Sequence, residues 1–238
     1  FNFIDKLRWS DNERWARDKF YDLPGGQSTR LLDAGCGIGV FTRFYARKGF
    51  EVYAIDLTST AIETTKKSLQ LYGLKAEVKE ASVEQIPYPD AYFDYIVSNG
   101  VIHHTPGTEQ AAREFLRVLK LGGRASVCIY YRNALLRAPL WPIVRMLLPL
   151  LLNKKQGREE MLTVKTPEDL VKFYDGNQTP IAKVYSRHEA EALFPDAKIL
   201  ASELHYFPIR FLRFLKPGGW LHAALDRYCG CLIYLLVE

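Results

Sequence analysis

The sequence predicts an α/β protein: a doubly wound, mostly parallel sheet of seven strands with inserted lid helices. Between residues 29 and 130, short apolar runs typical of buried strands alternate with amphipathic stretches of helical period. A glycine-rich turn at 35–39 directly follows the first apolar run. Two further apolar runs, at 198–205 and 229–237, extend the same sheet near the end of the chain.

Turn and capping residues set the boundaries of these elements. Gly49 and Gly73 end two helices, a turn at 122–123 precedes the fifth strand, and Ser186 and Glu189 have the spacing of a capping box. The expected strands cover residues 30–34, 51–55, 76–79, 93–98, 124–130, 198–205 and 229–237. The expected helices cover residues 40–48, 58–72, 109–119 and 190–194, with one or two amphipathic helices within 1–28.

Composition narrows the function class. A chain of 238 residues with 48% hydrophobic side chains can bury a core as one domain. The net charge of +5 is too small to indicate nucleic acid, so we do not expect that partner. The four cysteines fit reduced thiols in a cytoplasmic protein, and we expect no metal, although His103-His104 and Cys229-x-Cys231 could supply a site on paper. No signal-peptide pattern opens the chain, and its first residue is not Met, which leaves a longer native N-terminus open.

The most informative stretch is Leu31-Leu-Asp-Ala-Gly-Cys-Gly-Ile-Gly39. Glycine tolerates positive φ and lets a ligand approach the main chain closely. A dinucleotide-binding turn would have its third glycine at position 40, where this chain has Val40, and no Lys-Ser/Thr pair of a P-loop follows. The turn is therefore suited to a nucleoside without a pyrophosphate.

Five motifs, in this order and spacing, resemble those of the class I S-adenosylmethionine-dependent methyltransferases. They are the turn at 31–39, Ala54-Ile-Asp-Leu57, Glu84-Gln-Ile-Pro-Tyr88, Phe93-Asp-Tyr-Ile-Val-Ser-Asn99 and Leu119-Lys-Leu-Gly-Gly-Arg124. The resemblance is close over residues 29–130 and extends in outline to the last two strands. It implies the Rossmann-like methyltransferase fold with an antiparallel last strand, and S-adenosyl-L-methionine as cofactor with S-adenosyl-L-homocysteine as product.

The resemblance assigns cofactor-binding roles to the matching residues. Asp33 would lie by the amino-acid end of the cofactor, where Gly35 and Gly37 let the backbone approach. Asp56 would accept hydrogen bonds from both ribose hydroxyls, because a carboxylate offers two acceptor oxygens. Leu57 would pack on the adenine face. The alternative is that Asp56 has no role in binding and is simply an acidic residue near the start of the helix that begins at Thr58.

Three further residues complete the expected cofactor site. Asn99 would border the methionine part of the cofactor. Ser82 stands where the family often has an acid that accepts from the adenine amino group, and the backbone at Val83 would contribute to the same contact. A hydroxyl accepts that bond less strongly, so adenine recognition is the part of the pocket that this sequence supports least.

His103 and His104 are the candidate catalytic residues. They follow the fourth strand, at the carboxyl edge where open α/β sheets bind ligands. Alignment of two reactants supplies much of the rate of a methyl transfer, and a base is needed only if the acceptor must lose a proton. Histidine suits that role near neutral pH, with His104 preferred. The alternative is that both histidines pack in the loop.

The acceptor must be inferred from two variable segments, 133–152 and 206–220, which combine bulky apolar residues with Arg or Lys. Residues 131–165 carry seven basic and two acidic side chains. These features predict lid elements or, alternatively, an apolar acceptor pocket fed from a membrane surface, as in quinone and lipid methyltransferases of the family. Three prolines and two arginines in the first segment argue against a membrane-spanning helix.

The expected function is methyl transfer by in-line displacement to a small, hydrophobic acceptor, with O-methylation slightly favoured. Localisation is expected to be cytoplasmic, with peripheral membrane contact and the oligomeric state left open. Two alternatives also stay open: a non-catalytic cofactor-binding regulator, and an enzyme that uses the cofactor for other chemistry. The expected parts are an N-terminal helical lead-in (1–28), the cofactor-binding α/β core (29–130), a lid and acceptor-binding insertion (131–195) and C-terminal strands with a basic aromatic insertion (196–238).

Overall fold

The computed structural model describes residues 1, 5, 16–137, 139–151, 165, 166, 169, 180–206 and 220–238. Within them, seven strands form one sheet in the order β3-β2-β1-β4-β5-β7-β6. Strands β3, β2, β1, β4 and β5 are parallel, and β7 runs antiparallel to both β5 and β6. The strands are β1 (Arg30–Ala34), β2 (Glu51–Asp56), β3 (Glu77–Glu80), β4 (Phe93–Asn99), β5 (Leu119–Tyr130), β6 (Ile199–His205) and β7 (Leu232–Val237). The predicted seven-stranded, mostly parallel sheet is confirmed, including its antiparallel last strand.

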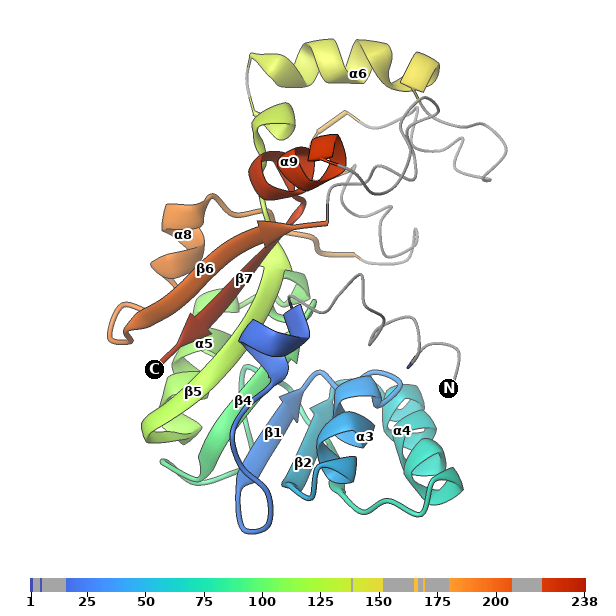
Figure 1. Cartoon of the computed structure of the whole chain (residues 1–238), viewed down its shortest axis with the longest axis vertical. Coiled ribbons are helices and arrows are strands. Elements are labelled where there is room, and N and C mark those ends of the chain that lie inside the picture. The colour runs from blue at the N-terminus through green and yellow to red at the C-terminus, as the bar shows by residue number, and fades with distance from the viewer. Residues whose placement is uncertain are drawn as a thin grey trace.

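Helices cover both faces of the sheet, which makes it doubly wound (Figure 1). One face carries the short π-helical turn η2 (Arg17–Tyr21), α3 (Val40–Arg47) and α4 (Ser59–Leu71), and the other carries α5 (Thr108–Val118) and α8 (Arg187–Glu191). Each face has its own apolar core. Phe41 and Tyr45 of α3 pack with η2, whereas Phe115 of α5 packs with Phe194, just after α8.

Local capping explains where two of these helices begin. The Thr58 side chain accepts a hydrogen bond from the Ala61 N–H at the start of α4. The predicted capping box of α8 is present: Ser186 accepts from the Glu189 N–H, and Glu189 accepts from the Ser186 N–H.

Two boundary predictions are wrong. The expected turn at 122–123 lies inside β5, where Gly122 has φ 73° and the pairing with β4 shifts register, since Phe93 is opposite Leu119 but Tyr95 is opposite Arg124. Cys229 ends α9 (Trp220–Cys229) and does not begin a strand. Gly230 makes the turn, because a Cβ there would lie 2.6 Å from the carbonyl oxygens of Asp226 and His205.

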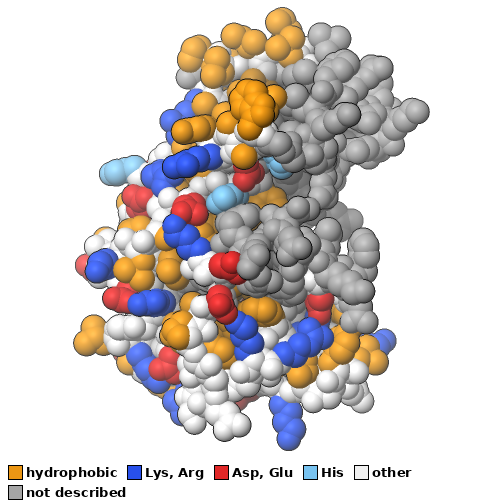
Figure 2. All heavy atoms as spheres, viewed as in Figure 1, with side chains coloured by type: hydrophobic (Ala, Val, Ile, Leu, Met, Phe, Trp, Pro, Cys, Tyr) orange, Lys and Arg blue, Asp and Glu red, His pale blue; other side chains and the backbone are white. Residues whose placement is uncertain are grey.

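Beyond the carboxyl end of β5 lie η4 (Ala134–Leu136), α6 (Leu140–Leu151) and α9, in the region where lid elements were expected (Figure 1). Apolar side chains gather on the surface at this end of the molecule (Figure 2). Among the described residues, no helix has the length and apolar character needed to cross a membrane. The N-terminal helices expected within 1–28 lie largely outside the described residues, as does most of the segment 206–220.

Candidate functional site

Most of the predicted site residues lie at the carboxyl edge of the parallel strands. The glycine turn follows β1, Asp56 ends β2, Ser82 follows β3, and Asn99 ends β4. Strands β2 and β4 pair on opposite sides of β1, so the sheet winds outward in both directions from this point. Such a switch point is where open α/β sheets bind ligands.

The three glycines of the turn all have positive φ, at 88° for Gly35, 52° for Gly37 and 77° for Gly39. A Cβ on Gly35 would lie 2.3 Å from the side chain of Val101, so packing requires glycine there. A Cβ on Gly37 would meet no atom within 4 Å. Gly35 is therefore required by packing, whereas the space beside the Gly37 Cα is unobstructed.

Asp33 lies buried beneath the turn, and the Thr42 hydroxyl donates a hydrogen bond to its Oδ2 at 2.5 Å. Burial raises the pKa of Asp33 to about 6, although the hydrogen bonds from Thr42 and the charge of Arg43 act in the opposite direction. A carboxylate held in this way would be stabilised by a cationic ligand group.

Asp56 is joined to the turn directly. Its Oδ2 accepts from the Gly37 N–H at 3.0 Å, and its Oδ1 accepts from the N–H (3.0 Å) and hydroxyl (2.9 Å) of Thr58. Leu57 is 71% exposed beside it. This pair offers acceptor oxygens and an apolar surface side by side.

Ser82 and Val83 are placed differently from each other. Ser82 Oγ accepts from the Glu84 N–H at 3.1 Å and stabilises the turn after β3. Val83 is buried, and its side chain packs in the core under α5. The Ala81 N–H donates to the Asp56 carbonyl oxygen at 2.9 Å, which keeps this turn next to β2.

Asn99 contacts a residue that sequence reasoning did not single out. Its Nδ2 donates to the Tyr21 hydroxyl at 2.5 Å, and the Tyr21 carbonyl accepts from the Tyr45 hydroxyl at 2.8 Å. Tyr21 belongs to η2 and was only one of several aromatics in the N-terminal stretch, so no spacing in the sequence distinguished it. The structure adds it to the site.

The two histidines differ sharply in environment. Both lie in the 3₁₀ helix η3 (Ile102–His104), with ring centroids 4.0 Å apart. His103 is fully buried against Tyr130, burial lowers its pKa well below the usual range, and neither ring nitrogen has a hydrogen-bond partner in the described part of the chain. His104 is partly exposed, and its Nδ1 lies 2.7 Å from the Ile181 carbonyl oxygen.

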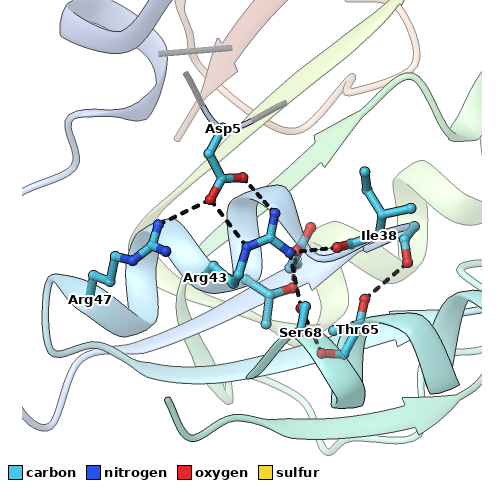
Figure 3. A network of polar contacts seen from close by, with 9 residues as sticks. Asp5, Ile38, Arg43, Arg47, Thr65 and Ser68 are labelled. Atoms are coloured by element: carbon cyan, nitrogen blue, oxygen red, sulfur yellow. Dashed lines mark hydrogen bonds and ion pairs between the residues drawn. The ribbon is translucent and has the colours of Figure 1, made fainter. Parts of the chain in front are cut away.

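The carbonyls of the glycine turn are held by two helices (Figure 3). Thr65 of α4 donates to the Gly37 carbonyl at 2.9 Å, and Arg43 of α3 donates to the Ile38 carbonyl at 2.6 Å. Sequence reasoning missed both. Arg43 could have been noticed in the sequence, because it is a charged residue among the aromatic residues of the helix at 40–47, which was expected to pack on the sheet.

Comparisons with known proteins indicate a methyltransferase domain in this part of the chain. Residues 32–127 match the family described as a methyltransferase domain. The chain is 32% identical over 101 residues to malonyl-[acyl-carrier protein] O-methyltransferase of Enterobacter lignolyticus (strain SCF1), covering 42% of this chain and 39% of that protein. It is 33% identical over 104 residues to the ubiquinone/menaquinone biosynthesis C-methyltransferase UbiE of Vibrio vulnificus (strain YJ016), covering 41% and 40%.

The similarity in structure extends further than the similarity in sequence. A solved S-adenosylmethionine-dependent methyltransferase from Methanosarcina mazei superposes with a TM-score of 0.61 at 20% identity, covering 91% of this chain and 94% of that one. At that identity the likeness concerns the fold alone. The sequence matches span about two fifths of the length of the two curated relatives.

Proposed function

We propose that the chain is a class I S-adenosylmethionine-dependent methyltransferase that transfers a methyl group to a small, hydrophobic acceptor, because residues 32–127 match a methyltransferase domain. The observation that carries the proposal is the hydrogen bond between the Gly37 N–H and Asp56 Oδ2, which joins the glycine turn to the carboxylate that ends β2. Curated relatives that match the same region include an O-methyltransferase and a C-methyltransferase. O-methylation is the slightly favoured outcome.

The proposed donor site uses the residues around the turn. Asp56 would hold the ribose hydroxyls, with Leu57 against the adenine, and Ser82 and the Val83 backbone nearby. A carboxylate has about four lone-pair sites, and the three contacts from Gly37 and Thr58 leave room for only one more hydrogen bond. The Thr58 hydroxyl can rotate away, so ribose binding would displace that contact and keep the two backbone contacts.

Asp33 would pair with the ammonium of the cofactor's amino-acid end, which would place a cation next to its buried carboxylate. Asn99 would border the same end, held in orientation by Tyr21. The bound cofactor supplies an activated methyl on a sulfonium. The protein would align the sulfonium methyl with the acceptor atom, and such alignment can lower the activation barrier by about 7–11 kcal/mol.

His104 is the proposed general base. A carbonyl oxygen only accepts hydrogen bonds, so in the neutral ring the contact with Ile181 places the proton on Nδ1, and a proton taken up in catalysis would go to Nε2. An acceptor hydroxyl must lose a proton during methylation, and Nε2 could take it. His103 was the second candidate, but an acceptor could reach it only after its packing against Tyr130 opened.

A hydrophobic acceptor, with peripheral membrane contact, is favoured by the lid elements. Leu140, Ile143 and Met146 of α6 are exposed, and Arg145 lies exposed among them. An apolar helix surface that carries a cation is typical of helices that lie at a lipid interface. Trp220 at the start of α9 is also exposed.

The test is transfer of labelled methyl. Purified protein is incubated with methyl-labelled S-adenosylmethionine and a lipid-rich metabolite extract, and the label is partitioned into organic solvent. We expect organic-soluble label together with release of S-adenosylhomocysteine, and neither with the Asp56→Ala variant. Water-soluble label alone would overturn the hydrophobic acceptor.

The same assay separates the two alternatives. Binding of S-adenosylmethionine without release of S-adenosylhomocysteine would indicate a cofactor-binding regulator. Consumption of the cofactor without a methylated product would indicate other chemistry.

A further inference from the structure

The buried guanidinium of Arg43 connects Asp5, near the start of the chain, to the glycine turn (Figure 3). Arg43 is fully buried. Its Nε and Nη2 donate to the two carboxylate oxygens of Asp5, at 3.2 and 2.5 Å. Its Nη1 donates to the Ile38 carbonyl at 2.6 Å and to Ser68 Oγ at 3.0 Å. One side chain therefore bridges the N-terminal region, the turn and α4.

Asp5 is the counterion of this buried cation. Its Oδ2 also accepts from Arg47 Nη1 at 3.1 Å. Burial acts to raise the pKa of Asp5, but the hydrogen bonds and charges of Arg43 and Arg47 outweigh it, so the pKa lies below its usual value. Asp5 is thus anionic at neutral pH. A buried Arg without such a partner is strongly disfavoured.

The contact with the Ile38 carbonyl constrains the turn. A peptide unit is planar, so a held carbonyl also fixes the N–H of the same unit. The Ile38 carbonyl shares its unit with the Gly39 N–H, which donates to the Cys36 carbonyl at 2.8 Å. The preceding unit is fixed by Thr65, which donates to the Gly37 carbonyl. Two consecutive peptide units of the turn are therefore held from behind, on the side of α3 and α4.

We propose that Asp5 is a positioning residue for the cofactor: by holding Arg43 against the Ile38 carbonyl, it keeps the glycine turn in the conformation that binds. The inference rests on the cofactor-binding role of the turn in the proposed function. The effect passes through Arg43, because among the described residues the polar partners of the Asp5 carboxylate are Arg43 and Arg47. By linkage, cofactor binding and the Asp5–Arg43 contact strengthen each other.

The test compares Asp5→Asn with a matched control, Asp22→Asn. Asp22 also belongs to the N-terminal region, and it pairs with Lys48 just after α3. It is exposed, and Lys48 lies at the end of α3 opposite to the glycine turn. S-adenosylhomocysteine binding is measured by calorimetry at 25 °C, and thermal unfolding is followed in parallel. We expect about tenfold weaker binding for Asp5→Asn and a change of less than about twofold for Asp22→Asn.

A purely structural role would lower the unfolding temperature of Asp5→Asn while its affinity at 25 °C stayed within twofold of the unaltered protein, and that result would overturn the proposal. If Asp5→Asn does not fold, Asp5→Glu replaces it, because it keeps a negative charge beside Arg43 but displaces the carboxylate by one methylene from the two guanidinium contacts. We then expect binding weaker by about threefold, and unchanged binding would again overturn the proposal. Failure of the unaltered protein to bind at all would refute the proposed function instead.

Discussion

The backbone N–H of Gly37 donates to Asp56 Oδ2 at 3.0 Å, so a single hydrogen bond joins the turn after β1 to the acid that ends β2. Thr58 holds the other oxygen of the same carboxylate. The carboxylate is therefore oriented by its neighbours, with its acceptor oxygens next to the glycine turn. A site whose groups are oriented before binding loses less free energy when the ligand arrives.

Asp56→Ala should weaken cofactor binding much more than Ser82→Ala. Loss of the carboxylate removes hydrogen bonds to a charged group, each worth about 1.5–3 kcal/mol, so we expect a loss of affinity of about 30-fold or more. Ser82 Oγ is engaged by the Glu84 N–H, and its removal should cost less than about fivefold. Calorimetry with S-adenosylhomocysteine measures both. Equal losses would mean that the two roles are wrongly assigned.

Gly35→Ala and Gly37→Ala should separate folding from binding. At Gly35 the new methyl would overlap Val101, and positive φ adds strain, so we expect destabilisation of about 3 kcal/mol or more. At Gly37 only the positive φ acts, at a cost of about 1–2 kcal/mol, but the methyl would stand where the ligand approaches.

Urea unfolding and calorimetry distinguish the two glycine variants. Gly37→Ala should remain folded and lose most of its affinity for S-adenosylhomocysteine. Native affinity in folded Gly37→Ala would show that the ligand does not contact this part of the backbone.

Asp33→Asn should stabilise the ligand-free protein at neutral pH and impair binding. The folded pKa of about 6 lies above the ordinary value of 3.8, so the folded state binds the proton more tightly than the unfolded chain. The stabilisation linked to this group is complete below about pH 4 and is lost as pH rises through about 6. A shift of about two units corresponds to about 3 kcal/mol.

The free energy of unfolding of Asp33→Asn, relative to that of the unaltered protein, should therefore rise by up to about 3 kcal/mol between pH 4 and pH 7.5. Denaturant unfolding at several pH values measures this difference. Asn retains an acceptor for the Thr42 hydroxyl, so the fold contact survives. Cofactor affinity at pH 7.5 should fall, because the carboxylate that would pair with the ammonium is gone. A difference that does not depend on pH would contradict the assigned shift.

The sequence predicted the architecture because strand and helix periods along 29–130 are strong local signals. Capping residues such as Ser186 with Glu189 were equally visible. The errors arose where local chemistry was ambiguous. Gly122 and Gly123 suit a turn or a bulge, and only pairing with β4 decides between them. Cys229 is apolar enough for a strand, but the close packing at Gly230 places the chain reversal after it.

The site residues that belong to a local sequence motif could be predicted, whereas those that reach the site through long-range contacts could not. Asp33, the glycines and Asp56 come together because they end adjacent strands. Tyr21 and Asp5 reach the site from the N-terminal region, and their partners Asn99 and Arg43 lie 78 and 38 residues away in the sequence. Such pairings leave no period or spacing in the chain. The different burial of the adjacent histidines is likewise a tertiary effect.

His104→Asn should lower turnover without weakening cofactor binding. The Asn amide can still donate to the Ile181 carbonyl, so the loop keeps its anchor while the basic Nε2 is lost. General-base catalysis contributes about 10²–10⁴-fold, so we expect kcat to fall by about 100-fold or more with an acceptor identified in the labelling assay. His188→Asn, at an exposed position in α8, is the control. Unchanged turnover and an unchanged pH profile would exclude His104 as the base.

The exposed side of α6 should bind anionic membranes. Ile143 and Met146 present apolar surface beside Arg145, so insertion at the interface would bury the former and pair the latter with anionic headgroups. In flotation with phosphatidylglycerol vesicles we expect the unaltered protein to rise with the lipid, and the double variant Ile143→Glu/Met146→Glu to stay in solution. Leu71→Glu, at an equally exposed leucine on α4, should still float. If the unaltered protein stays wholly in solution, the membrane contact is excluded, and the apolar side chains of α6 must be assigned to the acceptor pocket alone.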